Sequence, residues 1–208
     1  MTKKVSPKTC RGVRRGERLT NCSRDRCGRR YNAFTLIELI VVVSIIAVLG
    51  ALVLSTAGYA RKKGARARAE TEIAAMSAAC ENYKADKGVY PYNNVTNGLN
   101  ARTRGDPTDT ADPTYSNASF YLYTQLSGDT AGDRNPTGKS YMVFKPNMLL
   151  PTGGTGTVTA IADPFGYSYG YSTANQVDPT TGYNPTFDLW STASGRTIGD
   201  APKWIKNW

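Results

Sequence analysis

Apolar residues fill one continuous stretch of the chain, residues 39–57, which carries no charged side chain. About twenty residues in a helix rise about 30 Å, which is the thickness of the hydrocarbon core of a bilayer. The stretch therefore predicts a membrane-spanning helix. Glu38 stands directly before it, and a carboxylate at the edge of a membrane helix is costly unless it is paired. We therefore expect Glu38 to have a partner.

Hydrophobic periodicity continues beyond this stretch, but on one side of the helix only. Apolar side chains recur there at intervals of three and four residues: Ile73, Met76, Ala79, Cys80 and Tyr83. This spacing is typical of a helix that buries one face. Residues 58–87 are therefore expected to form an amphipathic stalk that packs on a sheet and ends at Lys87 and Gly88.

The pattern in the rest of the chain is shorter and less regular. Residues 92–115 are rich in Asn, Thr, Asp and Pro and predict a long loop. Residues 116–126 predict a short helix that Ser116 or Asn117 caps and Gly128 ends. Strands are predicted at 141–144, 157–161, 167–172 and 186–191, with a turn at 163–166. The expected fold class is α+β, with a long N-terminal helix packed on a small antiparallel β-sheet.

The net charge of +10 is concentrated at the N-terminus. Residues 1–33 hold eleven Lys or Arg and two acids, whereas the remainder holds fifteen and fourteen. A nucleic-acid-binding protein would carry its charge on the folded domain, so no nucleic-acid partner is expected. A basic segment before an apolar helix stays on the cytoplasmic side of a membrane. We therefore interpret residues 1–33 as a basic leader.

Residue composition excludes most catalytic chemistry. The chain has no histidine, so it lacks imidazole as an acid, a base or a metal ligand. Of the four cysteines only Cys80 lies beyond the leader, and it is expected to be a buried apolar residue. A membrane-anchored hydrolase would need a nucleophile with a base. We therefore expect no enzyme.

Three interpretations of the apolar stretch differ in where the chain is cut. A plain single-pass anchor is not cut, and an ordinary secretory signal is cut after the stretch, near the small residues 55–57. A third kind of signal is cut before the stretch, so that the apolar helix stays on the product. Glu38 favours this third interpretation, because an ordinary signal gains nothing from an acid at that place.

The string AFTLIEL at residues 33–39, followed by the apolar stretch, resembles the N-terminal signature of type IV pilins and of the pseudopilins of type II secretion systems. A second string, residues 81–91, resembles the Tyr…Asp-x-Gly-x-Tyr-Pro junction of pseudopilins. The pattern of residues 163–208 is similar to the C-terminal part of the major pseudopilin. The match covers the membrane helix, the end of the stalk and the C-terminal strands.

This resemblance implies a processing route and a domain organisation. A prepilin peptidase would cut between Ala33 and Phe34, although the family usually has Gly before the cut, and the new amine of Phe34 would be methylated. The resemblance then divides the chain into a cleaved leader (1–33), a filament-core helix (34–57), a stalk (58–87) and a globular β-rich domain (88–208). Glu38 would meet the Phe34 amine of a neighbouring subunit, where charge pairing replaces lost hydration.

The resemblance also implies a place and partners. The chain would cross the inner membrane once, with its C-terminal domain in the periplasm. It would associate with itself in a helical filament that drives protein export, and with minor pseudopilins, the inner-membrane secretion platform and the prepilin peptidase. The alternative is a type IV pilus pilin for adhesion, motility or DNA uptake. The short, Cys-poor C-terminal part argues against that alternative.

Two further sites remain open on the sequence alone. A basic patch (Arg61, Lys62, Lys63, Arg66 and Arg68) either is solvated near lipid headgroups or meets acids of a neighbouring subunit. Major pseudopilins often hold Ca²⁺ before the C-terminus, and Asp188 and Asp200 are the acids that match here. Calcium takes six to eight oxygens and several negative charges, and Arg196 in the same loop works against it.

Overall fold

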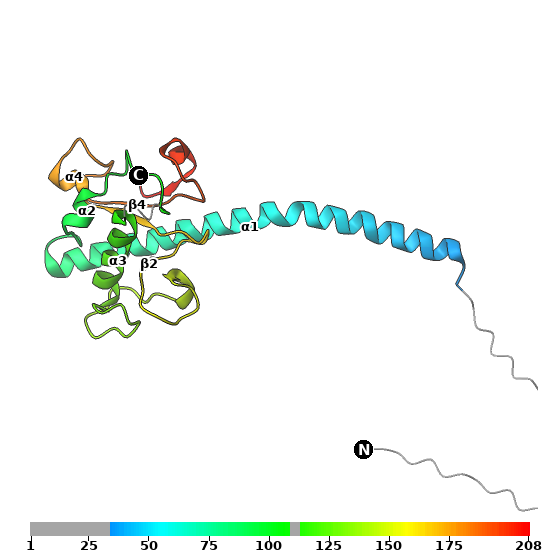
Figure 1. The fold of residues 1–208 in the computed structure, drawn as a ribbon, viewed down its shortest axis with the longest axis horizontal. Coiled ribbons are helices and arrows are strands. Elements are labelled where there is room, and N and C mark those ends of the chain that lie inside the picture. The colour runs from blue at the N-terminus through cyan, green and yellow to red at the C-terminus, as the bar shows by residue number, and fades with distance from the viewer. Residues whose placement is uncertain (1–33, 109–112) are drawn as a thin grey trace, which may run out of the picture. The chain divides into compact units, whose positions relative to one another are not determined.

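The computed structural model describes residues 34–108 and 113–208, without the side chains at 55 and 56. The leader interpretation of residues 1–33 lies outside the described residues. The fold is α+β, as predicted (Figure 1). Its elements in chain order are α1 (Leu36–Lys87), α2 (Asn94–Gly98), α3 (Thr114–Ser127), η1 (Pro146–Met148), β1 (Leu149–Leu150), β2 (Ala160–Ile161), β3 (Gly170–Ser172), α4 (Ala174–Val177), β4 (Asp188–Ser191), η2 (Ile198–Lys203) and β5 (Ile205–Lys206).

Helix α1 ends where the sequence predicted. Gly88 follows Lys87 with a φ of 79°, in the left-handed region that favours glycine. Its amide donates to the carbonyl of Lys84 at 2.7 Å, which satisfies one of the free carbonyls of the last turn. The described residues divide into two units, residues 34–47 and residues 48–208. The second unit contains the globular part and the stalk that packs against it.

The predicted apolar stripe of the stalk forms one side of the main hydrophobic core. Ile73, Met76, Ala79 and Cys80 are buried, and Tyr83 packs against them at the edge. Their partners come from α3 and from the strands and the segments next to them, including Leu122, Leu126, Ile161, Tyr171 and Leu189. Figure 1 shows this part of α1, in cyan and green, beside α3 and the sheet. Burying one helix face removes apolar surface from water and holds the stalk to the domain.

Two small antiparallel sheets complete the domain. One pairs β1 with β2, and the other has the strand order β3-β4-β5. Gly170 of β3 pairs with Trp190 of β4, and a Cβ atom at Gly170 would come within 2.2 Å of the indole ring. Glycine is therefore required at this position, because only its bare backbone leaves room for the tryptophan.

Three of the four predicted strands are present but shorter than predicted, and the fourth is absent. Only the ends of 157–161, 167–172 and 186–191 pair as strands. Residues 141–144 form no strand, because the amides of Tyr141 and Met142 both donate to the carbonyl of Leu126, at 2.8 and 3.0 Å. This segment therefore completes the end of α3 instead of joining a sheet. The turn at 163–166 is confirmed, with the amide of Gly166 donating to the carbonyl of Asp163 at 3.0 Å.

The helix predictions of the domain were partly right. The predicted loop 92–115 contains the short helix α2, which Asn93 caps by accepting from the amide of Thr96. Helix α3 begins at Thr114, and its cap is Pro113 without a side-chain hydrogen bond, so the predicted caps at Ser116 and Asn117 were wrong. The predicted stop at Gly128 is confirmed by its left-handed conformation.

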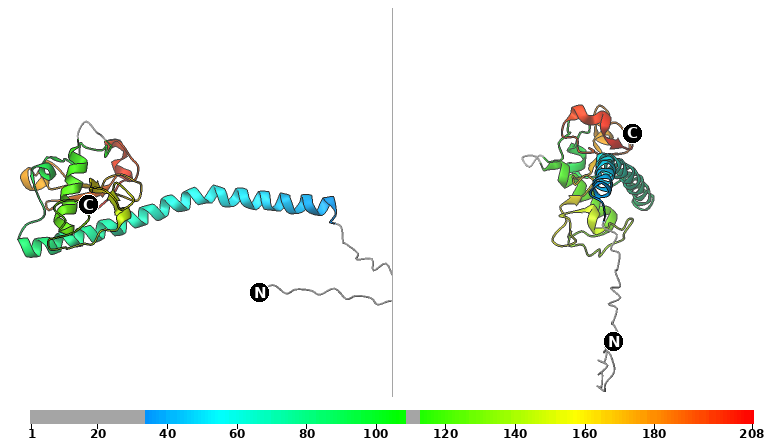
Figure 2. Two further views of the ribbon diagram at one scale, coloured as in Figure 1. Left: turned by 60° about the horizontal axis from the view of Figure 1, so that its bottom comes forward. Right: turned by 90° about the vertical axis from the view of Figure 1, so that its right-hand side faces the viewer.

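A second, aromatic core holds the C-terminal segment. Trp190 lies face to face with Trp204, with ring centroids 6.1 Å apart, and meets the edge of Tyr115 at 5.6 Å. Figure 2 shows the C-terminal segment in red and the loops of residues 130–157 in yellow-green on opposite sides of the stalk. Helix α3 supplies residues to both cores, whereas no described residue of α1 belongs to the second one.

Candidate functional site

Three hydrogen bonds between Thr35 and Glu38, in both directions, cap the start of α1. The amide and the hydroxyl of Thr35 donate to Oε2 of Glu38 at 2.9 and 2.8 Å. The amide of Glu38 donates to Oγ1 of Thr35 at 3.3 Å. This is the geometry of a capping box, which satisfies amides that have no partner in the first turn. The acid also lies at the positive end of the helix dipole.

Glu38 uses only one carboxylate oxygen in this arrangement. Both bonds from Thr35 go to Oε2, and Oε1 accepts no hydrogen bond from any described residue. The site can therefore keep its helix cap and still accept a hydrogen bond from another molecule. Phe34, which precedes the cap, has 79% of its surface exposed.

The helix that follows exposes a large apolar surface, whose contact with water is unfavourable. Its large apolar side chains from Leu36 to Leu54 are 49% to 78% exposed. Among the described residues, α1 is long and apolar enough to cross a membrane by length and composition, with a mean hydropathy of 3.0 in its most apolar window. An apolar patch this large marks a membrane or protein contact.

Thr35 is a residue that the sequence analysis missed. Its signal was present, because Thr followed three positions later by Glu, just before an apolar run, is the sequence pattern of a capping box. Ala33 lies outside the described residues, so the cut between Ala33 and Phe34 stays a prediction. The role of Glu38 between subunits also stays a prediction.

The basic patch does not act as one unit. Arg66 donates to the carbonyl of Lys203 at 2.8 Å, which ties the stalk to η2. Arg68 pairs with Glu72 one turn later at 2.6 Å. These two cations are therefore engaged by their own chain, while Arg61, Lys62 and Lys63 are exposed and form no ion pair with other described residues.

The two acids proposed for calcium are already occupied. Asp188 accepts the amides of Tyr183 and Asn184, one on each oxygen, both at 2.8 Å. Asp200 accepts Thr197 at 3.0 Å and Lys203 at 3.1 Å. The described residues hold no group of three or more acids, cysteines or histidines that could share an ion. Asp188 and Asp200 are therefore part of no such group, and the calcium site stays a prediction.

A serine in a suggestive pattern is also structural. Residues 166–170 read GYSYG, which has the spacing of a hydrolase nucleophile turn. Ser168 is buried and forms an isolated bridge with Ala162, and the next element is the strand β3 instead of a helix. The chain has no histidine to activate it. Ser168 is therefore not a nucleophile.

Comparison with known proteins decides the family. The family model described as "Prokaryotic N-terminal methylation motif" matches residues 28–54, which include Phe34 and Glu38. Type II secretion system core protein G of Pectobacterium carotovorum is 31% identical over 121 residues, 58% of this chain and 71% of the relative. The chain belongs to the core protein G family. It is a pseudopilin, and the family is structural and not enzymatic.

Other relatives of the pseudopilin support the same assignment. Core protein G of Pseudomonas aeruginosa is 35% identical over 123 residues, 59% of this chain and 80% of the relative. Core protein G of Aeromonas hydrophila is 30% identical over 121 residues, 58% of this chain and 78% of the relative. No solved structure matches the pseudopilin significantly.

Proposed function

We propose that a prepilin peptidase cuts this pseudopilin between Ala33 and Phe34, and that the product assembles through α1 into a helical filament for protein export. The new amine of Phe34 is methylated. The methylation motif that spans both residues supports this proposal. The carrying observation is the exposed apolar surface of α1 directly behind the capped Glu38.

Before assembly, this surface lies in lipid. The basic leader stays in the cytoplasm and the apolar helix crosses the inner membrane once, which places the domain in the periplasm. Assembly exchanges lipid contacts for close packing between neighbouring helices, which is the driving force for helix association in membranes. The partners in this step are minor pseudopilins and the inner-membrane secretion platform.

Glu38 sets the axial register of the filament. Its free Oε1 accepts a hydrogen bond from the Phe34 amine of a neighbouring subunit, while Oε2 keeps the cap with Thr35. A carboxylate and an ammonium group that are both removed from water must be paired, because an unpaired charge in an apolar interior is strongly unfavourable. Only a register that brings the two together is therefore stable.

The variant Glu38→Gln tests this proposal. Glutamine at this position preserves a capping box, so the substitution removes the charge and leaves the helix start intact. In cells that contain the secretion platform and the peptidase, we expect the variant to be cut at Phe34 but to form no filaments by electron microscopy.

The matched control is Thr35→Val, which keeps the carboxylate and removes the capping hydroxyl. It should cost about 1 kcal/mol of helix stability and still assemble. Normal filaments from Glu38→Gln would refute the charge pairing. A mature N-terminus after residue 57, measured by intact mass, would refute the whole route, because the filament helix would then be lost.

A further inference from the structure

The five cations after the apolar stretch divide into two groups. Arg66 contacts the Lys203 carbonyl of the globular domain, and Arg68 pairs with Glu72 one turn later on the same helix. Arg61, Lys62 and Lys63 are exposed, and their side chains make no hydrogen bond or ion pair with other described residues. Together with Tyr59, which is 72% exposed, they form what we call the basic collar. Three adjacent cations without a counter-ion point to a partner outside the chain.

The collar lies at a defined depth. Leu54 is the last large apolar residue of the stretch at 39–57. Arg61 lies seven residues further on, a distance of about 10 Å along a helix. When the apolar stretch fills the hydrocarbon core, this distance places the collar in the layer of lipid headgroups. Tyrosine is enriched at that boundary, because its ring is apolar and its hydroxyl is polar. The three cations and Tyr59 therefore all lie at the depth of the lipid headgroups.

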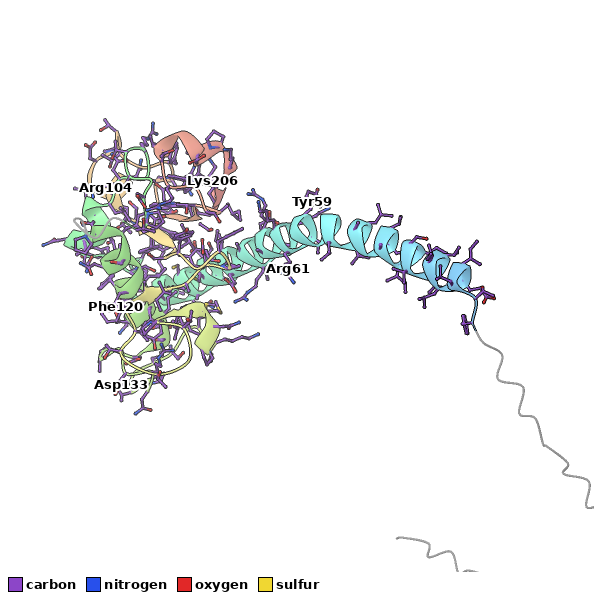
Figure 3. The ribbon with its side chains drawn as sticks, turned by 45° about the vertical axis from the view of Figure 1, so that its right-hand side comes forward. Tyr59, Arg61, Arg104, Phe120, Asp133 and Lys206 are labelled. Carbon is purple, nitrogen blue, oxygen red and sulfur yellow. The ribbon has the colours of Figure 1, made fainter. Side chains whose placement is uncertain are left out.

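The cations of the collar spread over about 200° of the helix circumference and do not form a narrow stripe. Successive residues of an α-helix are 100° apart, so Arg61, Lys62 and Lys63 project in three different directions. Figure 3 shows Tyr59 and Arg61 on different sides of α1. A partner protein would bind a one-sided patch, whereas lipid headgroups surround a membrane helix on all sides. The distribution therefore favours lipid.

The acids of a second copy are a poorer match. Among the described residues, four carboxylates already pair with cations of their own chain, namely Glu72, Asp86, Asp106 and Asp200. Exposed pairs formed by the remaining acids would contribute little. Phosphate groups of anionic phospholipids supply dense negative charge at the required depth.

We propose that the basic collar binds the headgroups of anionic phospholipids at the periplasmic surface of the membrane. This rests on the proposed function only in that α1 crosses the membrane. The contact stabilises the unassembled subunit in lipid, and it is given up when the subunit enters the filament.

Native mass spectrometry of the full processed chain in detergent tests this proposal, with phosphatidylglycerol and phosphatidylcholine at equal concentration as probes. The wild type should retain phosphatidylglycerol preferentially. The variant Arg61→Gln/Lys62→Gln/Lys63→Gln should lose this preference, by about fivefold for each cation removed. The matched control Lys145→Gln/Lys203→Gln/Lys206→Gln removes three cations of the globular domain and should keep it.

Each other outcome overturns the proposal. Equal retention of both lipids by the wild type excludes recognition of anionic headgroups, and release of the lipid by millimolar inorganic phosphate assigns the site to free phosphate. A collar variant that keeps its lipid but forms no filaments assigns the cations to a second copy. Lipid retention is measured on unassembled protein, so a failure of filament formation in the wild type refutes the proposed function and leaves the lipid result standing.

Discussion

Tyr169 donates its hydroxyl hydrogen to Oε2 of Glu72 at 2.8 Å, which joins the sheet to the stalk helix inside the main core. Arg68 donates to the other oxygen of the same carboxylate at 2.6 Å. Burial, together with the charge of Glu72, raises the pKa of the Tyr169 hydroxyl, so it remains a donor at any physiological pH. This contact fixes the position of α1 along the sheet, because any other register leaves Oε2 of the buried Glu72 without its donor.

Tyr169→Phe should lower the free energy of unfolding by about 1–3 kcal/mol, because it leaves an oxygen of Glu72 buried without a donor. Urea unfolding of the full chain in detergent, followed by tryptophan fluorescence, measures the change. Tyr92→Phe is the control, since the side chain of Tyr92 is 51% exposed. Equal stability of the two variants would mean that the contact with Glu72 does not hold the stalk.

Gly170→Ala should destabilise the domain by about 1–3 kcal/mol, because the added methyl group overlaps the ring of Trp190 and forces the strands apart. The emission spectrum of Trp190 should also shift as its packing loosens. Gly98→Ala is the control, because nothing lies within 4 Å of a Cβ atom at that position and its φ is not positive. An unchanged unfolding midpoint for Gly170→Ala would contradict the observed register of β3 and β4.

Asp163 should make stability depend on pH in the direction opposite to most acids. Burial raises the pKa of its carboxyl above the ordinary value of 3.8, although Ser191 and the amides of Tyr167 and Phe165 donate to it. The native state therefore binds a proton that the unfolded chain releases. The stability that this group contributes falls as pH rises from 3.8 through the raised native pKa.

The neutral variant Asp163→Asn lacks this titration, so its stability relative to the wild type should increase with pH across that window. Unfolding free energies of both proteins, measured from pH 3 to pH 7, give the difference. Asp178→Asn is the control of opposite sign, because hydrogen bonds from the amide and the hydroxyl of Thr180 lower the pKa of Asp178. A flat difference for Asp163→Asn would show that its carboxyl is not desolvated.

Removal of calcium should leave the protein unchanged. Both oxygens of Asp188 accept backbone amides, so the loop is held without an ion. The thermal unfolding midpoint should be the same in EGTA and in millimolar CaCl₂. Asp188→Asn should lower stability by about 1–3 kcal/mol, because an amide group then faces a backbone N–H. Asp200→Asn, which loses an exposed pair, should have a smaller effect. A midpoint that falls in EGTA and recovers with calcium would contradict this.

The sequence by itself determined the features that depend on local periodicity and composition. Helix α1, its end at Lys87, its buried stripe through Met76 and Cys80 and the stop of α3 at Gly128 all follow from residues close together in the chain. The strings around Phe34 and at residues 81–91 indicated the pseudopilin family for the same reason, since each motif is contiguous. Such features need no knowledge of what lies across the core.

Tertiary structure alone decided which partners distant residues find. Residues 141–144 have the composition of a strand, but their amides donate to Leu126 at the end of α3. Arg66 belongs to the basic run that follows the apolar stretch, yet it contacts the globular domain through the carbonyl of Lys203. The carbonyls of Leu126 and Lys203 lie far along the chain from the donors that reach them. Only the packing of the chain brings each pair within about 3 Å, and that proximity is not encoded in local spacing.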